Sequence, residues 1–216
     1  MSSRTESGLR FSSRELLDLG VAWVALGLAF AVFFARGGQG FVRALVGGGA
    51  VTLVVVSLLT AGVGFLLHEL AHKVVATRFG QVAEFRADYG MLFVGVMSAL
   101  VGFIVAAPGA VHHRGYLSER EHGLIALAGP AMNLLLAVLF VPLLVVGAVG
   151  AGSNLVLELG ARGLAVNLFL AAFNMIPYGG IDGKTVLGWS KVVWALVFFP
   201  SAAVTVFVVF VLGIGF

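Results

Sequence analysis

The chain has 216 residues, of which 60% are hydrophobic and 11% are charged, and its mean hydropathy is +1.09. A soluble domain carries about 25% charged residues, so this composition excludes a soluble globular protein, and the high apolar content excludes a disordered one. The net charge of +3 gives no sign of nucleic-acid binding and fits the positive loops of a membrane protein. Because the chain has no cysteine, any metal ion must be held by His, Asp or Glu.

Six uncharged stretches define the expected membrane organisation. They lie at residues 19–35, 44–67, 89–111, 123–157, 163–181 and 192–216. A helix needs about 20 apolar residues to cross a bilayer, so each stretch is long enough or nearly so. The first stretch exceeds the apolar segment of a signal peptide, and we expect it to be retained. We therefore expect an all-α polytopic membrane protein in one integral domain (1–216), with five or six transmembrane helices, a cytoplasmic tail (1–15) and a C-terminal transmembrane helix (191–216).

The second stretch ends in three ionisable residues, His68, Glu69 and His72, which are costly to place in lipid. They match the pattern H-E-x-x-H. Positions i and i+4 of a helix share one face and lie about 6 Å apart, so the two imidazoles can bind one zinc ion. Glu69 is close enough to act on a metal-bound water molecule without being a ligand. Two packed histidines and a glutamate at a wet helix end are the alternative.

Zinc held by two histidines needs a third protein ligand and an open position. Asp182 is the best candidate, because Pro177 and the glycines 179–180 make the preceding backbone irregular. Irregular backbone at membrane depth lines protein or a water-filled cavity. The alternative is an ordinary turn at the membrane interface. Rival ligands lie in polar stretches where a surface role is expected: Glu84, Asp88, His112, His113 and His122.

Three segments together resemble the motifs of the site-2 protease family, the intramembrane zinc metalloproteases. Residues 68–72 match its H-E-x-x-H helix, and residues 174–183 match its N-x-x-P…L-D-G segment, with Ile181 where Leu is usual. Residues 129–133 match the G-P-x-x-N signature at the start of the intervening core helix. The three motifs occur in the family's order, and the resemblance marks residues 60–190 as the catalytic core.

The resemblance implies a role for each matched polar residue. His68, His72 and Asp182 would bind one Zn²⁺, Glu69 would be the catalytic acid and base, and Asn174 would position or polarise the scissile carbonyl. The implied substrates are single-span membrane proteins in the lipid bilayer.

Two other motif residues also have simple structural interpretations. Proline is common at the first position of a helix, so Pro130 predicts a helix start. Asn133 is suited to a hydrogen bond between membrane helices.

The positions of Lys and Arg favour a re-entrant segment over a sixth span. If all six stretches span, the inside carries 7 basic residues and the outside 6, which is no bias. If residues 89–111 enter the membrane and return, 10 lie inside and 3 outside, as the positive-inside rule expects. The second topology also puts His72 and Asp182 near the same, cytoplasmic face. A sixth span with a different connection is the alternative.

Residues 81–88 alternate weakly between polar and apolar side chains. A period of two predicts a short β-strand after the zinc helix, and the edge of such a strand can bind an extended substrate. A plain interfacial loop is the alternative.

These patterns predict an intramembrane zinc metalloprotease, multi-pass in the cell membrane, with its active site near the cytoplasmic face. The alternative is a zinc or other divalent metal transporter, or a metal-binding membrane protein. An inactive homologue that serves as a binding scaffold is a third possibility. Glu69 distinguishes the first two classes, because a carrier needs no base beside the metal. The oligomeric state is left open.

Overall fold

The computed structural model describes residues 9–105 and 108–215, without the side chains of residues 113 and 114. Five helices in this part of the chain are long and apolar enough to cross a membrane. They are α1 (Ser13–Phe34), Ala50–Arg78, α6 (Glu119–Ala148), α7 (Asn154–Asn174) and Lys191–Val211. The last joins α9 (Lys191–Val206) to the π-helical turn η2 (Phe207–Val211). The prediction of an all-α polytopic membrane fold is confirmed.

The span Ala50–Arg78 consists of α3 (Ala50–Ser57), the π-helical turn η1 (Leu58–Gly62) and α4 (Val63–Arg78). A π-turn adds one residue to the helix and leaves its hydrogen bonds irregular. Trp23 on α1 donates its indole N–H to the carbonyl of Leu58 at 3.0 Å. A Cβ atom at Gly62 would lie 2.6 Å from the Trp23 ring, so glycine is needed for this contact.

Five shorter elements complete the fold: α2 (Gly38–Val46), β1 (Val82–Ala87), α5 (Tyr89–Leu100), β2 (Gly109–Arg114) and α8 (Asp182–Trp189). The strand expected at residues 81–88 is present as β1. It pairs antiparallel with β2, which the apolar pattern did not predict, in a register that aligns Val82 with Arg114 and Ala87 with Gly109. Helix α2 was not predicted either, because three glycines in residues 37–40 are typical of a loop.

The stretch 89–111 does not form a sixth span. Helix α5 has 12 residues, which at 1.5 Å per residue measures about 18 Å, whereas the bilayer core is about 30 Å thick. The chain then returns and forms β2 beside β1, so it ends on the side from which it started. These observations favour the re-entrant topology.

Two expected boundaries around α6 and α7 were wrong. Helix α6 begins at Glu119, after a capping box in which Ser118 and Glu121 bond reciprocally, so Pro130 lies inside this helix and does not start one. Helix α7 begins at Asn154, before the stretch 163–181, and takes in two charged residues. Glu158 pairs with Arg162 at 3.2 Å, and the Arg162 guanidinium lies 4.6 Å from the centre of the Phe34 ring, so the helix accommodates both charges.

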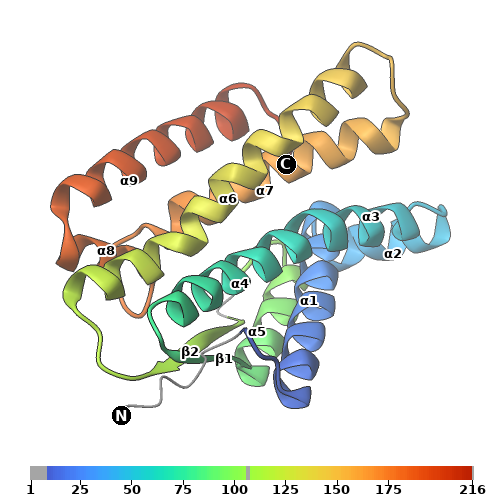
Figure 1. Ribbon diagram of the computed structural model, residues 1–216. Helices are drawn as coiled ribbons and strands as arrows, with labels where there is room; N and C mark the ends of the chain where they lie inside the picture. The colour runs from blue at the N-terminus through green and yellow to red at the C-terminus, as the bar shows by residue number, and fades with distance from the viewer. Residues whose placement is uncertain (1–8, 106–107, 216) are drawn as a thin grey trace.

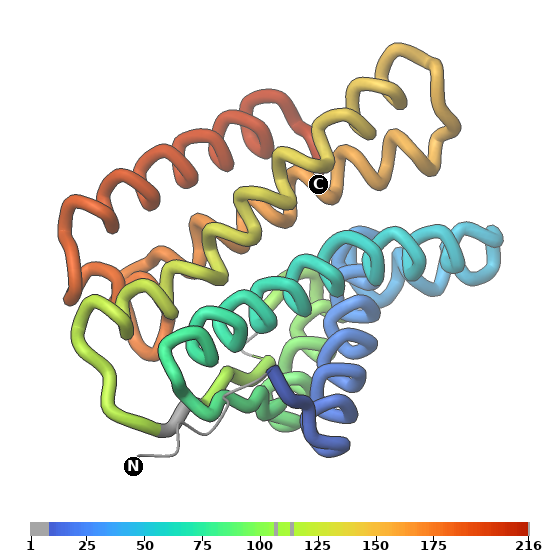
Figure 2. The backbone as a smooth tube through the Cα atoms, in the orientation of Figure 1, coloured from blue at the N-terminus to red at the C-terminus, as the bar shows by residue number. Residues whose placement is uncertain are grey.

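The elements form two groups (Figures 1 and 2). One group contains α1 to α5 and the sheet, and the other contains α6 to α9; they meet where α4 packs on α6 and where η1 packs on α7. Helices α6 and α7 form a close hairpin, in which Gly160 and Gly163 of α7 lie against Leu144 and Phe140 of α6. This arrangement puts α4, α6 and α8 next to one another at the end of the molecule that carries the sheet.

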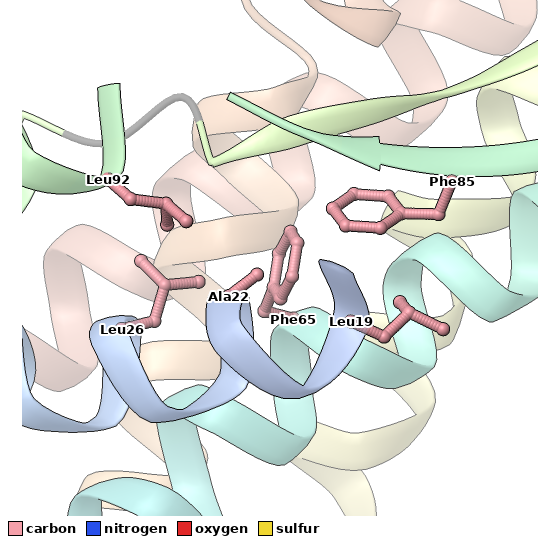
Figure 3. Close-up of a cluster of buried hydrophobic side chains, with 6 residues drawn as sticks. All are labelled: Leu19, Ala22, Leu26, Phe65, Phe85 and Leu92. Atoms are coloured by element: carbon pink, nitrogen blue, oxygen red, sulfur yellow. The ribbon is translucent and has the colours of Figure 1, made fainter. Parts of the chain in front are cut away.

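A cluster of buried apolar side chains fixes the sheet and α5 against α1 and α4 (Figure 3). Its members are Leu19, Ala22, Leu26, Phe65, Phe85 and Leu92. The rings of Phe65 and Phe85 meet edge to face with their centres 5.7 Å apart. Phe65 precedes the H-E-x-x-H residues by one helical turn, so this packing also holds the zinc-motif helix in place.

Carboxylates of α1 bind the outer edge of β1, the edge that does not pair with β2. Glu15 forms a fully buried ion pair with Lys73 of α4 and accepts the backbone N–H of Phe85 at 3.0 Å. Asp18 accepts the hydroxyl of Tyr89 at 2.6 Å and the N–H of Ala87 at 3.4 Å. Since α1 begins at Ser13, the last residues of the segment 1–15 belong to this helix.

Single cysteines can test this topology, because the chain has none of its own. Val82 and Tyr116 are exposed near the sheet, and Ala151 is exposed between α6 and α7. We expect Val82→Cys and Tyr116→Cys to react with a membrane-impermeant maleimide from the same side, and Ala151→Cys from the opposite side. In a six-span protein, Val82 and Ala151 would share a side and Tyr116 would lie across the membrane.

The ion pair between Glu15 and Lys73 gives a second test. Glu15→Gln leaves the Lys73 ammonium buried without its counter-charge, which costs about 3–5 kcal/mol. We expect a clearly lower Tm for this variant, measured by circular dichroism in detergent, and recovery of most of the loss in Glu15→Gln/Lys73→Met, which buries no charge. A Glu15→Gln variant as stable as the wild type would contradict this assignment.

Candidate active site

Two distant segments bring three metal-binding side chains together. His68 and His72 lie one turn apart on α4, and Asp182 is the first residue of α8. Oδ2 of Asp182 lies 3.2 Å from Nε2 of His68 and 3.3 Å from Nε2 of His72, and the two Nε2 atoms are 3.0 Å apart. Among the residues that the structure describes, these three form the one group able to hold a metal ion.

The geometry of this group fits one zinc ion. Ligands placed 2.0–2.1 Å from zinc in a tetrahedron stand about 3.3 Å from one another, close to the separations observed. Oδ2 of Asp182 is buried and accepts no hydrogen bond from any residue that the structure describes. A Cβ atom at Gly129 of α6 would lie 2.5 Å from Nε2 of both histidines. The space beside the donor atoms therefore exists only because α6 has glycine at this position.

Asp182 is ionised at neutral pH. Burial acts to raise the pKa of its carboxyl group, but positive charge on the neighbouring imidazoles of His72 and His68 outweighs burial and lowers this pKa to about 2. The carboxylate is the form that binds metal ions.

Hydrogen bonds from the opposite side of each ring orient the two histidines. Nδ1 of His72 lies 2.7 Å from the carbonyl oxygen of Ile125, which can only accept, so Nδ1 carries the hydrogen. Nδ1 of His68 lies 2.6 Å from Oδ1 of Asn133. A metal ion binds the neutral form of each ring, and with the hydrogen on Nδ1 that form carries its free lone pair on Nε2, on the side of Asp182; such partners are typical behind metal-binding histidines.

Glu69 lies beside the metal-binding group without belonging to it. It follows His68 on α4, is buried, and lies near the backbone N–H of Val111 on β2. A carboxylate in this position can take a proton from a water molecule at the metal and pass it on.

A cavity of about 710 Å³ opens onto these residues. Its polar lining includes Glu69, Asp182 and Asn174, whereas its apolar lining comes from Leu26, Phe30, Phe65, Phe169 and Phe173, among others. Asn174 donates one amide N–H to the carbonyl of Leu170 at 2.9 Å, and its second N–H stays available for a ligand. The structure thus brings every sequence-predicted site residue to one cavity.

The rival ligands lie elsewhere or outside the metal-binding group. Glu84 bonds Ser12 and Arg86, Asp88 caps α5, and His112 contacts the carbonyl of Ala110. His122 lines the cavity but is not part of the group. The side chain of His113 lies outside the described part of the chain.

Sequence reasoning missed the residues that support the ligands. The carbonyl of Ile125 leaves no signal in a sequence, because every residue has one. Asn133 was expected to bond between helices, and it does, but its partner is the ligand His68. The buried pair between Glu15 and Lys73 had a signal, since a lysine directly follows His72 in an apolar helix.

Comparison with known proteins agrees with this site. The chain is 37% identical over 203 residues to the "Putative zinc metalloprotease MJ0611" of Methanocaldococcus jannaschii, a match covering 93% of this chain and 97% of that protein. It is 30% identical over 145 residues to the "Putative zinc metalloprotease YwhC" of Bacillus subtilis, covering 60% of this chain and 66% of that protein. No family model matches the chain, and no solved structure matches it significantly. A match of this identity over nearly the whole of both chains shows that the protein belongs to the zinc metalloprotease family of the M. jannaschii protein.

Proposed function

We propose that this protein is an intramembrane zinc metalloprotease of the site-2 protease type, which hydrolyses peptide bonds within or near the transmembrane segments of single-span membrane proteins. One observation carries the proposal. The metal-binding group, with Glu69 beside it, lies in a cavity whose other walls are apolar faces of the membrane helices. Such a cavity suits a substrate that is itself apolar.

The residues of the cavity divide the chemistry among them. His68, His72 and Asp182 would hold Zn²⁺, which would lower the pKa of a water molecule and polarise a carbonyl group. Glu69 takes a proton from the attacking water and delivers it to the leaving amine. Asn174 directs its free amide N–H at the carbonyl oxygen and stabilises the negative charge that develops there.

The substrate backbone binds at the outer edge of β2. A peptide bond in a helix is shielded because its carbonyl is already bonded, so the substrate must unwind, and strand addition satisfies the freed backbone groups. The edge of β1, which the sequence suggested for this role, is occupied by Glu15 and Asp18. Gly109 and Val111 of β2 line the cavity.

The active site faces the cytoplasm. With five spans and a re-entrant segment, 9 of the 12 Lys and Arg residues in the described part of the chain lie on the side of the sheet and of Asp182. The positive-inside rule makes this side cytoplasmic.

Two substitutions separate the role of the base from that of a ligand. Glu69→Gln should keep one zinc ion per chain and lose cleavage of a model transmembrane peptide by about 10²-fold or more, because general acid–base catalysis is removed. Asp182→Ala should lose both zinc and cleavage. Zinc is measured by elemental analysis of the purified protein.

Glu84→Gln is the matched control, because Glu84 lies on β1 and outside the cavity; it should cleave like the wild type. Normal cleavage by Glu69→Gln contradicts the assigned roles. Zinc flux into liposomes without any proteolysis would favour the transporter alternative.

A further inference from the structure

A buried asparagine of α7 lies behind the metal-binding group. Asn167 has no exposed surface, and its Nδ2 lies 2.9 Å from the carbonyl oxygen of Gly163. A backbone carbonyl can only accept a hydrogen bond. The NH₂ end of the Asn167 amide must therefore face Gly163, and its oxygen must face the opposite way, towards α6.

The next member of the chain of hydrogen bonds is Asn133 of α6, which is also fully buried. Its Nδ2 lies 2.9 Å from Oδ1 of Asn167 and 3.1 Å from the carbonyl oxygen of Gly64 on α4. These two acceptors use both N–H groups of the Asn133 amide. Its oxygen is therefore turned towards Nδ1 of His68, at 2.6 Å.

The orientation of these two amides determines which nitrogen of His68 carries the hydrogen. Because Oδ1 of Asn133 accepts, Nδ1 of His68 carries the hydrogen and Nε2 carries the lone pair. If the Asn133 amide were reversed, its NH₂ would face Nδ1, and the neutral ring would carry its hydrogen on Nε2, where Asp182 and His72 are 3.2 Å and 3.0 Å away.

We infer that Asn167 is a positioning residue for the metal site, acting through Asn133 to fix the orientation and the metal-binding tautomer of His68. The inference rests on the proposed function, because it requires that His68 binds the metal. Without an acceptor at position 167, one N–H of Asn133 is left unpaired in the interior. The amide then loses one of the hydrogen bonds that fix its orientation.

Asn167 packs tightly against α4. A Cβ atom at Gly64 would lie 2.7 Å from its Oδ1, so α4 and α7 are in close contact here. The hydrogen bonds of Asn133 and Asn167 join α4, α6 and α7 next to His68.

The test measures metal binding by the full chain in detergent and needs no substrate. Asn167→Leu keeps the number of side-chain heavy atoms and the branch at Cγ, and removes the acceptor. We expect its zinc affinity, from chelator competition, to fall about 10–100-fold, as is typical when a partner behind a ligand is lost. The visible absorption of the Co²⁺-substituted protein should change as well, because the geometry at His68 changes. If Asn167→Leu does not fold, Asn167→Ala is measured in the same way.

Leu168→Ala is the matched control, since Leu168 is the next residue of α7 and lies in a separate apolar cluster. It should lower the Tm and leave the zinc affinity and the Co²⁺ spectrum unchanged. A purely structural role for Asn167 predicts the same behaviour for Asn167→Leu, which would overturn the inference.

A double-mutant cycle tests the route through Asn133. In the background of Asn133→Ala, Asn167→Leu should change zinc affinity by less than about twofold, because coupled residues are not additive. Additive losses would overturn the inference and leave the proposed function intact. A wild-type protein that binds neither Zn²⁺ nor Co²⁺ would overturn both.

Discussion

Three side chains able to bind one metal ion converge in the interior of this protein. The lone pairs of His68 and His72 and the carboxylate of Asp182 converge within 3.3 Å. Other features of the active site support this arrangement. Glycine at position 129 leaves space beside the Nε2 atoms, and hydrogen-bond partners at each Nδ1 atom orient the two rings. Two segments more than 100 residues apart are thereby held at one point.

The surroundings of the metal-binding group determine which molecules can reach it. Its donors lie at the end of an apolar span and at the start of a short helix outside the spans, so the ion is placed where water and an apolar chain can both reach it. Glu69 lies between the metal-binding group and the backbone of β2. The sheet therefore borders the cavity beside Glu69, while the metal-binding side chains come from helices.

Features that depend on composition and local spacing were predictable from the sequence, and those that depend on contacts between distant residues were not. The spans follow from apolar length, and the residues His68, Glu69 and His72 from a helical repeat. The second strand was hidden because its first three residues, 109–111, belong to the apolar stretch 89–111 and become part of a strand only by pairing with β1. The start of α7 was misplaced because Glu158 and Arg162 neutralise each other. The blocked edge of β1 depends on Glu15, which is 70 residues away from Phe85 in the chain.

The π-helical turn η1 has a consequence for how the zinc-motif helix can be built. The π-turn Leu58–Gly62 makes bonds one residue longer than those of an α-helix, so it takes up an extra residue locally. Deleting one residue there would convert the span to a regular α-helix and leave the histidines directed at Asp182. Trp23, which bonds the carbonyl of Leu58, thus stabilises an irregular turn that the direction of the ligands does not require.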